Sequence, residues 1–387
     1  YIQNHFDYSG NALLDDQSSC SSYTFASAPS TSGCPGNYSY YGNNRTATKT
    51  RWYQEAWYRY MQARWGYSTN IHSWELMNEG DPFNGLHYAQ ADEFGKYLKQ
   101  FTPNQHLITT SFWNSFPKTD FWANSSYPNI DYADQHLYID KNTNTSGFYD
   151  PVLSVLNLSN LIGAKTAGGV NKPTMRGETG LTDSGTQPGT LEVNADTNGI
   201  WLHKYIWAGI NPGGVLESYW YDKEHIYPTA KDFRGEFGKY YNFINAIPLS
   251  NGNYVDVAAS ASDLNLRVLG QKDPLLGRAH LWIDNKTHTW GNILNNIANF
   301  VPVTKAIVTF SGMPDGAYNV SWFDVYTGTV TKTETTQTLA GVVTLDLPQA
   351  LDAGKGDIAV KVENAGLPSP TPTPVPTLNS EDDLKRK

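Results

Sequence analysis

Two glutamates stand where acid–base and nucleophilic chemistry could be divided between a pair of carboxyl groups. Glu79 ends the run WELMNE at residues 74–79, directly before Gly-Asp-Pro, and Glu178 ends the run MRGE at residues 175–178, directly before Thr-Gly. One carboxyl of such a pair can protonate a leaving oxygen while the other attacks carbon. A single glutamate at the end of a strand more commonly pairs with an arginine or caps a helix, so the pair needs support from other residues.

Two further motifs give that support. His136 and Tyr138 end an apolar run between the two glutamates, and Trp220 ends the run that follows Glu178. In a parallel (β/α) barrel the carboxyl ends of the strands form one face, so all of these side chains would meet there. A pair of carboxyl groups about 5–5.5 Å apart is the arrangement of a retaining glycosidase.

The order Asn-Glu, His-x-Tyr, Glu and Trp resembles the clan of retaining (β/α)8-barrel glycoside hydrolases, most closely the cellulase- and mannanase-like members of family 5. The resemblance covers residues 1–247. It implies that Glu79 is the acid/base and Glu178 the nucleophile, with no cofactor and no metal. Glu79 would hold a proton while Glu178 is ionised, and the two would exchange roles after the first step.

The resemblance also implies substrate contacts from the other strand ends. Asn78 would bind the sugar 2-hydroxyl, Tyr138 would donate a hydrogen bond to Glu178, and His136 would orient the acid side. Trp220 would lie under the sugar, because an indole face suits the weakly apolar C–H face of a sugar ring. Two residues are weaker candidates: Trp113 is a subsite platform or a core residue, and His5 contacts substrate or is satisfied by its neighbours.

The elements that must position these residues alternate along the first part of the chain. Strands are predicted at residues 1–6, 70–79, 106–113, 132–139, 173–178 and 215–221, and helices at 51–65, 88–101, 152–165, 198–208 and 233–246. This alternation favours an α/β fold with a parallel sheet. Only one strand precedes Glu79, so we expect a TIM-type (β/α)8 barrel that lacks its first two strand–helix units. Trp52, Trp57 and Trp65 recur on the first helix and are predicted to lie in the core.

The second part of the chain has a different pattern of predicted secondary structure. Residues 248–364 read as short strands separated by turn residues such as Met-Pro-Asp-Gly, which predicts an antiparallel β-sandwich accessory domain. We expect it to be structural. Residues 365–387 begin with the Pro/Thr-rich run LPSPTPTPVPT and are predicted to be a disordered linker and tail.

The amino-acid composition limits the kinds of binding partner that the protein is expected to have. The chain has 28 basic and 37 acidic residues, a net charge of −9, which argues against nucleic acid. No apolar run is long enough to cross a bilayer. Cys20 and Cys34 predict a disulfide, with free thiols as the alternative. Low charge, the possible disulfide and the Pro/Thr-rich linker favour a location outside the cell, secreted or surface-attached. We expect a monomer, and the resemblance implies a polysaccharide or oligosaccharide substrate.

Alternation along the strands gives one structural hypothesis. Residues two apart share a face, so Glu75 would point into the barrel below Glu79. A buried carboxylate needs a partner, and Arg176 is proposed to supply it. An Arg176 side chain directed into solvent would refute this pairing.

The sequence therefore predicts a retaining hydrolase of a β-linked polysaccharide, a β-1,4-glucan or a mannan, cleaved internally by double displacement. The alternative is a non-catalytic carbohydrate-binding barrel. A metal-dependent hydrolase is a third possibility, but no His/Asp cluster at ligand spacing is visible along the chain.

Overall fold

The computed structural model describes residues 49–69, 71–76, 86–100, 106–112, 118–156, 172–182, 193, 195–211, 216–219, 226 and 231–366. Of residues 49–54, 86, 87, 90 and 216–219 it describes the backbone alone. The chain divides into two compact units, residues 1–194 with 212–225 and residues 195–211 with 226–387. Each unit is considered by itself below.

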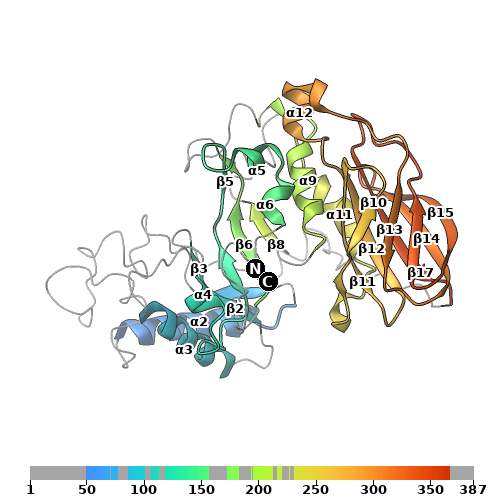
Figure 1. Ribbon diagram of the computed structural model, residues 1–387. Coiled ribbons are helices and arrows are strands. Elements are labelled where there is room, and N and C mark those ends of the chain that lie inside the picture. Colours follow the sequence, from blue (N-terminus) through green and yellow to red (C-terminus); the bar gives the residue numbers. More distant parts are fainter. Residues whose placement is uncertain are drawn as a thin grey trace, which may run out of the picture. The chain divides into compact units, whose positions relative to one another are not determined.

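Parallel strands form the centre of the first unit (Figure 1). β1 (Ser73–Glu75) pairs with β2 (Leu107–Thr109), and β5 (Ile139–Asp140) pairs with β7 (Leu181–Thr182). A four-stranded sheet has the order β3 (Ser111–Phe112), β4 (Ala133–Gln135), β6 (Thr174–Thr179), β8 (Leu216–Tyr219). Neighbours in space are therefore neighbours in sequence, as expected for strand–helix alternation. A closed barrel stays a prediction.

Helices complete the first unit. They are α2 (Lys49–Trp65), α3 (Leu86–Gln100), α4 (Thr119–Trp122), α5 (Thr145–Tyr149) and α6 (Val152–Val155). Aromatic side chains from α2, α3, α4 and β3 share one buried cluster, which includes Tyr58, Phe94, Phe112 and Trp122. The Tyr58 hydroxyl also donates to the carbonyl oxygens of Glu75 and Leu76, at 3.0 and 2.6 Å. Helix α2 is thus tied to the carboxyl end of β1.

The prediction that the tryptophans of α2 lie in the core is wrong for two of them. Trp57 and Trp65 are 40% and 41% exposed, whereas Tyr58 is fully buried. The side chain of Trp52 lies outside the described residues. Aromatic residues occur on all sides of this helix, so their three- and four-residue spacing could not identify the buried side.

Antiparallel sheets form most of the second unit. One has three strands in the order β10 (Ala259–Ala261), β13 (Ile307–Ser311), β16 (Val342–Asp346). The other has six, in the order β15 (Thr329–Thr338), β14 (Gly316–Asp324), β17 (Asp357–Asn364), β12 (Arg278–Asn285), β11 (Leu266–Asp273), β9 (Val255–Asp256). Leu281, Val308, Trp322 and Leu345 belong to one core that both sheets share. The antiparallel strands predicted for residues 248–364 are present.

The second unit also holds two helices that the sequence had suggested for the barrel, α9 (Ile200–Ala208) and α11 (Gly235–Ile244). Phe323 of β14 contacts Phe243 of α11, with ring centroids 5.2 Å apart, and Trp207 of α9, at 6.2 Å. These helices therefore pack on the six-stranded sheet. The unit also contains helix α12 (Trp290–Asn295) and two 3-10 turns, Leu249–Asn251 and Ile297–Asn299. None of the described helices is both long and apolar enough to span a lipid bilayer.

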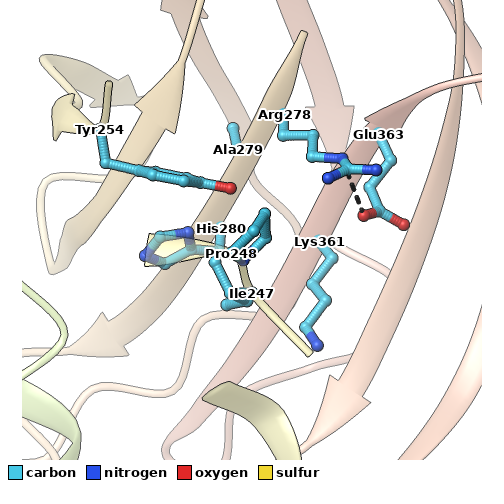
Figure 2. Close-up of a pocket in the computed structure, with 8 residues that line it drawn as sticks. All are labelled: Ile247, Pro248, Tyr254, Arg278, Ala279, His280, Lys361 and Glu363. Carbon is cyan, nitrogen blue, oxygen red and sulfur yellow. Dashed lines mark ion pairs between the residues drawn. The ribbon is translucent and has the colours of Figure 1, made fainter. Parts of the chain in front are cut away.

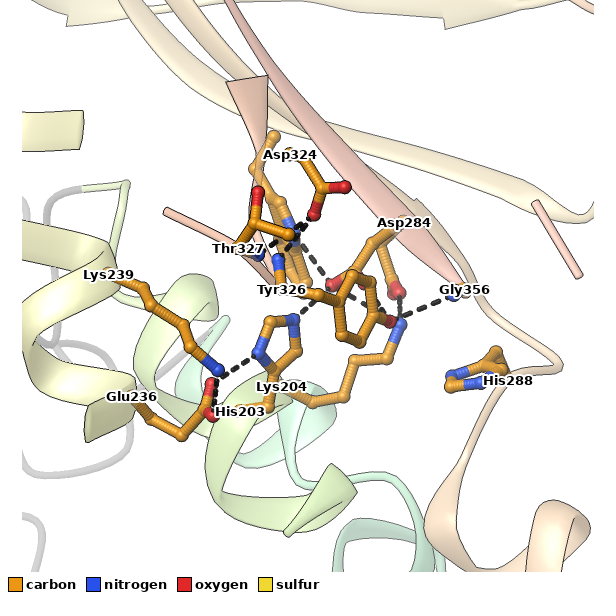
Figure 3. Close-up of polar contacts among 12 residues, drawn as sticks. His203, Lys204, Glu236, Lys239, Asp284, His288, Asp324, Tyr326, Thr327 and Gly356 are labelled. Atoms are coloured by element: carbon orange, nitrogen blue, oxygen red, sulfur yellow. Dashed lines mark hydrogen bonds and ion pairs between the residues drawn. The ribbon is translucent and has the colours of Figure 1, made fainter. Parts of the chain in front are cut away.

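A buried polar network joins α9 to the six-stranded sheet (Figure 3). His203 Nδ1 lies 2.9 Å from Glu236 of α11, and Nε2 lies 3.0 Å from Asp357 of β17. Both partners are carboxylate oxygens, which only accept, so both ring nitrogens carry hydrogen and the imidazole is cationic. Lys204 and Arg267 both bind Asp284. Burial lowers the pKa of His203, but the two carboxylates outweigh it and raise that pKa to about 9.

A second histidine of this unit, His280, is neutral where His203 is cationic. Figure 2 shows the side chains around it. His280 lies opposite Lys361 in the sheet, and its ring centroid is 5.4 Å from that of Tyr254. Burial, followed by the charge of Lys361, lowers the pKa of His280 to about 3. Its side chain lines a cavity of about 10 Å³, the size of a single water molecule.

We expect alkaline pH to weaken the second unit through His203. Its pKa is about 9 in the folded chain and near 6.5 when unfolded, so its stabilisation is complete below pH 6.5 and is lost as the pH rises through 9. The loss should be about 3 kcal/mol in the free energy of unfolding, measured by urea denaturation between pH 6.5 and 9.5. His203→Gln should be less stable than wild type at pH 6.5 and should largely lose this slope.

His280→Gln is the matched control. Because the pKa of His280 is lowered, its contribution is present above pH 6.5 and is lost only as the pH falls toward 3. The control should therefore keep the wild-type slope above pH 6.5. A wild-type unfolding free energy that stays flat from pH 6.5 to 9.5 would contradict the assignment of a cationic His203.

Candidate active site

Glu178 is the buried carboxylate around which the first unit gathers its polar side chains. It lies on β6 and is 4% exposed. The Tyr138 hydroxyl donates to its Oε2 at 2.8 Å, and His136 Nδ1 lies 3.5 Å from its Oε1. The contact between Tyr138 and Glu178 that the resemblance implied is therefore present. A hydroxyl and an imidazole thus lie against the two oxygens of this side chain.

His136 lies between two carboxylates. Its Nδ1 faces Glu178, and its Nε2 lies 4.0 Å from Oε1 of Glu75. The backbone fixes the position of the ring, because the amide of His136 donates to the carbonyl oxygen of Phe112 at 2.7 Å on the neighbouring strand. The sequence had placed His136 near the acid side, and among the described residues it contacts the nucleophile candidate directly.

Negative charge accumulates beneath this group. Glu75 and Asp134 are fully buried, and both raise the pKa of Tyr132, which burial raises most. The hydroxyl of Tyr132 is held by Ser73, with 2.8 Å between the two oxygens. Tyr132 therefore stays neutral, and its hydroxyl contributes hydrogen bonds rather than charge to this part of the sheet.

Arg176 is fully buried rather than directed into solvent, so the outcome that would have refuted its pairing with Glu75 does not occur. Its Nη2 donates to the carbonyl oxygen of Ser154 at 3.2 Å. The pairing itself stays a prediction. The shared face of Arg176 and Glu178, however, assumed an unbroken strand, and the pairing of β6 with β8 shifts register between Arg176 and Thr179. Simple alternation therefore does not apply across Glu178.

The structure brings together a cluster that the chain order did not reveal. One ligand-type atom from each of Glu75, Asp134 and His136 lies within 4.8 Å of the others, and all three residues are buried. The spacing along the chain showed no His/Asp cluster of this kind. Asp134 and His136 are two residues apart at the end of β4, and the fold brings Glu75 of β1, which is distant in sequence, beside them.

Several predicted site residues lie outside the described part of the chain. They are His5, Asn78, Glu79, Trp113 and Trp220, together with the cysteines Cys20 and Cys34. The separation of the two carboxyl groups, the tryptophan platforms and the disulfide therefore stay predictions. The nearest described residue to Glu79 in sequence is Leu76, whose carbonyl accepts from Tyr58.

Sequence reasoning gave no role to Asp134, which the structure places directly beneath the nucleophile candidate. Asp134 Oδ1 accepts from the amide of Gly177 at 2.7 Å, one residue before Glu178. The signal was present, since Asp134 and His136 are two apart and share a strand face. Together the group offers a carboxyl side chain, held by a hydroxyl and an imidazole, of the type that can attack an electrophilic carbon.

Comparison with known proteins gives structural likeness at low sequence identity. No family model and no curated protein matches the sequence. Similar solved structures include a protein described as a glycoside hydrolase (TM-score 0.48, 13% identity, 82% of this chain and 69% of that one) and a glycoside hydrolase family 5 protein from Bacteroides vulgatus ATCC 8482 (0.49, 12%, 82% and 68%). Another is CelM2, a bifunctional glucanase-xylanase from a metagenome library (0.38, 13%, 83% and 72%). These chains share a mixed α/β likeness with this one, and the functional argument rests on the site instead.

Proposed function

We propose that the protein is a retaining glycoside hydrolase that cleaves a β-linked polysaccharide, with Glu178 as nucleophile and Glu79 as acid/base. The observation that carries the proposal is the pair of contacts on Glu178, a Tyr138 hydroxyl at 2.8 Å and His136 Nδ1 at 3.5 Å. Together these contacts hold both oxygens of a buried side chain in place, as a positioned nucleophile requires.

The reaction would proceed in two displacements. A Glu178 oxygen attacks the anomeric carbon, the glycosidic C–O bond breaks, and Glu79 gives its proton to the leaving oxygen. Glu79, now ionised, then takes a proton from water as that water attacks the same carbon and releases Glu178. Two inversions at one carbon return the original configuration. The roles of Asn78, Trp113, Trp220 and His5 as sugar contacts belong to this proposal.

The substrate is proposed to be a β-1,4-glucan or a mannan that is cleaved internally, outside the cell. Low charge and abundant aromatic residues suit such a neutral, hydroxylated polymer. A panel of soluble glucans and mannans, with product lengths followed over time, would test both the sugar and the internal mode of cleavage. Release of monosaccharide alone from the first minutes would overturn the internal mode.

One observation favours a second candidate, a metal-assisted hydrolase. Ligand-type atoms of Glu75, Asp134 and His136 lie within 4.8 Å of one another. However, Asp134 Oδ1 already accepts from Gly177, and His136 Nδ1 faces Glu178. Dialysis against a chelator, followed by assay with and without added divalent cations, separates the candidates. Loss of turnover that a cation restores would favour the metal reading.

Glu178→Gln should abolish turnover, because the amide keeps the shape of the side chain and removes the nucleophile. We expect a fall on the order of a thousandfold in kcat on an aryl β-glycoside or a soluble polysaccharide.

The wild-type product should first appear as the β-anomer by NMR. Glu363→Gln, a carboxylate beside Arg278 in the second unit, is the control. An α-anomer as the first product would exclude retention. If wild type and Glu178→Gln bind the polysaccharide equally and neither turns it over, a non-catalytic barrel would be favoured.

Tyr138→Phe should reduce turnover, because Glu178 loses the hydroxyl that holds its Oε2. A hydrogen bond to a charged group is worth about 1.5–3 kcal/mol, so kcat/KM should fall by about tenfold to a hundredfold. Steady-state kinetics on a soluble polysaccharide give the measurement.

Tyr318→Phe is the matched control for that variant, since it loses a hydroxyl that donates to the carbonyl of Pro314 at 2.7 Å in the second unit. The control should keep the wild-type kcat/KM. If Tyr138→Phe keeps it too, the hydroxyl contact has no part in placing Glu178 for the reaction.

A further inference from the structure

Strand β6 gains one residue relative to both of its neighbours at the point where Glu178 lies. Beside β8, Arg176 pairs with Glu217 and Thr179 pairs with Tyr219, so three steps along β6 match two along β8. On the other side, the amide of Ala133 donates to Pro173 O, whereas the amide of Leu137 donates to Glu178 O. Four steps along that strand match five along β6. Together the comparisons place the extra residue between Arg176 and Thr179, at Gly177 or Glu178.

An extra residue of this kind is a β-bulge, which bends the strand and changes the direction of the side chains that follow. It also interrupts the hydrogen-bond ladder. The ladder resumes beyond Glu178, where Ile139 donates to Gly180 O at 2.9 Å and Lys141 to Thr182 O at 2.8 Å. The amide of Gly177 falls within the interruption.

Asp134 supplies the acceptor that the interrupted ladder lacks at this point. Its Oδ1 accepts from the Gly177 amide at 2.7 Å, and its side chain is fully buried. A bond from an amide to a carboxylate is stronger than the amide–carbonyl bond of a regular ladder. Because Asp134 is part of β4, which pairs with β6 through Ala133 and Thr174, the acceptor is itself rigidly placed.

We propose that Asp134 is a positioning residue for Glu178: it holds the bulge of β6 at Gly177 and so directs the next side chain toward Tyr138 and His136. The inference rests on the proposed nucleophilic role of Glu178. Asp134 would act through Glu178 rather than on the substrate. A misplaced reacting group can cost about a hundredfold in rate, so the effect should fall on kcat rather than on KM.

We call the hydrogen bond from the Gly177 amide to Asp134 the clamp. Two substitutions distinguish the clamp from a requirement for negative charge at position 134 alone. Asp134→Asn keeps an acceptor oxygen at the same reach and removes the charge. Asp134→Glu keeps the charge and moves the carboxylate outward by one methylene. The matched controls are Asp140→Asn and Asp140→Glu, because Asp140 Oδ1 accepts from the amides of Asn142 and Thr143 within its own turn at the end of β5, in the same unit.

The first experiment measures kcat and KM of the whole chain. We expect Asp134→Asn to stay within about threefold of wild type and Asp134→Glu to lose about tenfold to a hundredfold in kcat with little change in KM. Both Asp140 variants should behave alike. Equal losses in Asp134→Asn and Asp134→Glu, or no loss in Asp134→Glu, would overturn the clamp. Wild-type turnover in Glu178→Gln would instead defeat the proposed function.

The second experiment needs no turnover. Hydrogen exchange of the Gly177 amide, followed by NMR, should be slow in wild type and in Asp134→Asn, and faster by at least about tenfold in Asp134→Glu. Exchange of the Ile139 amide, which lies in the regular ladder, reports whether the sheet remains folded. Unchanged protection of Gly177 in a folded Asp134→Glu protein would refute the clamp whatever the activity.

Discussion

The site depends on placing one buried carboxyl side chain among other acidic ones. Burying such a polar group is costly unless hydrogen-bond partners replace the water. Glu178 accepts a hydrogen bond from the Tyr138 hydroxyl, and the His136 imidazole lies 3.5 Å from its other oxygen. The same imidazole faces Glu75, so one histidine lies between two acidic side chains.

The backbone that presents these groups is a set of short parallel strands in chain order. Such a sheet brings side chains that are about forty residues apart to one edge, because each strand lies beside the next along the chain. Regular alternation would then dictate which side chain faces the pocket. The extra residue in β6 departs from that rule at Glu178, and departures of this kind are concentrated beside active sites.

Much of the fold was predictable from the sequence, because period-two runs bounded by turn residues identify strands directly. The antiparallel strands of the second unit were predicted as a group, and β6 lies close to the strand predicted at residues 173–178. The strand predicted at residues 132–139 is instead two short strands, β4 and β5, with His136 between them. The contact of Tyr138 with Glu178 followed from the resemblance. The bulge, the role of Asp134 and the exposure of Trp57 and Trp65 did not follow, because each depends on register or on packing between segments distant in sequence.

The allocation of helices α9 and α11 has a consequence for how the protein can be dissected. The polypeptide passes between the two units at residues 194/195, 211/212 and 225/226. A single cut at the start of the antiparallel strands would leave Asp357 without the histidine and the lysine that α9 supplies. The antiparallel strands therefore cannot be moved to another protein by themselves. A chimera or truncation must also include residues 195–211, which belong to the same compact unit.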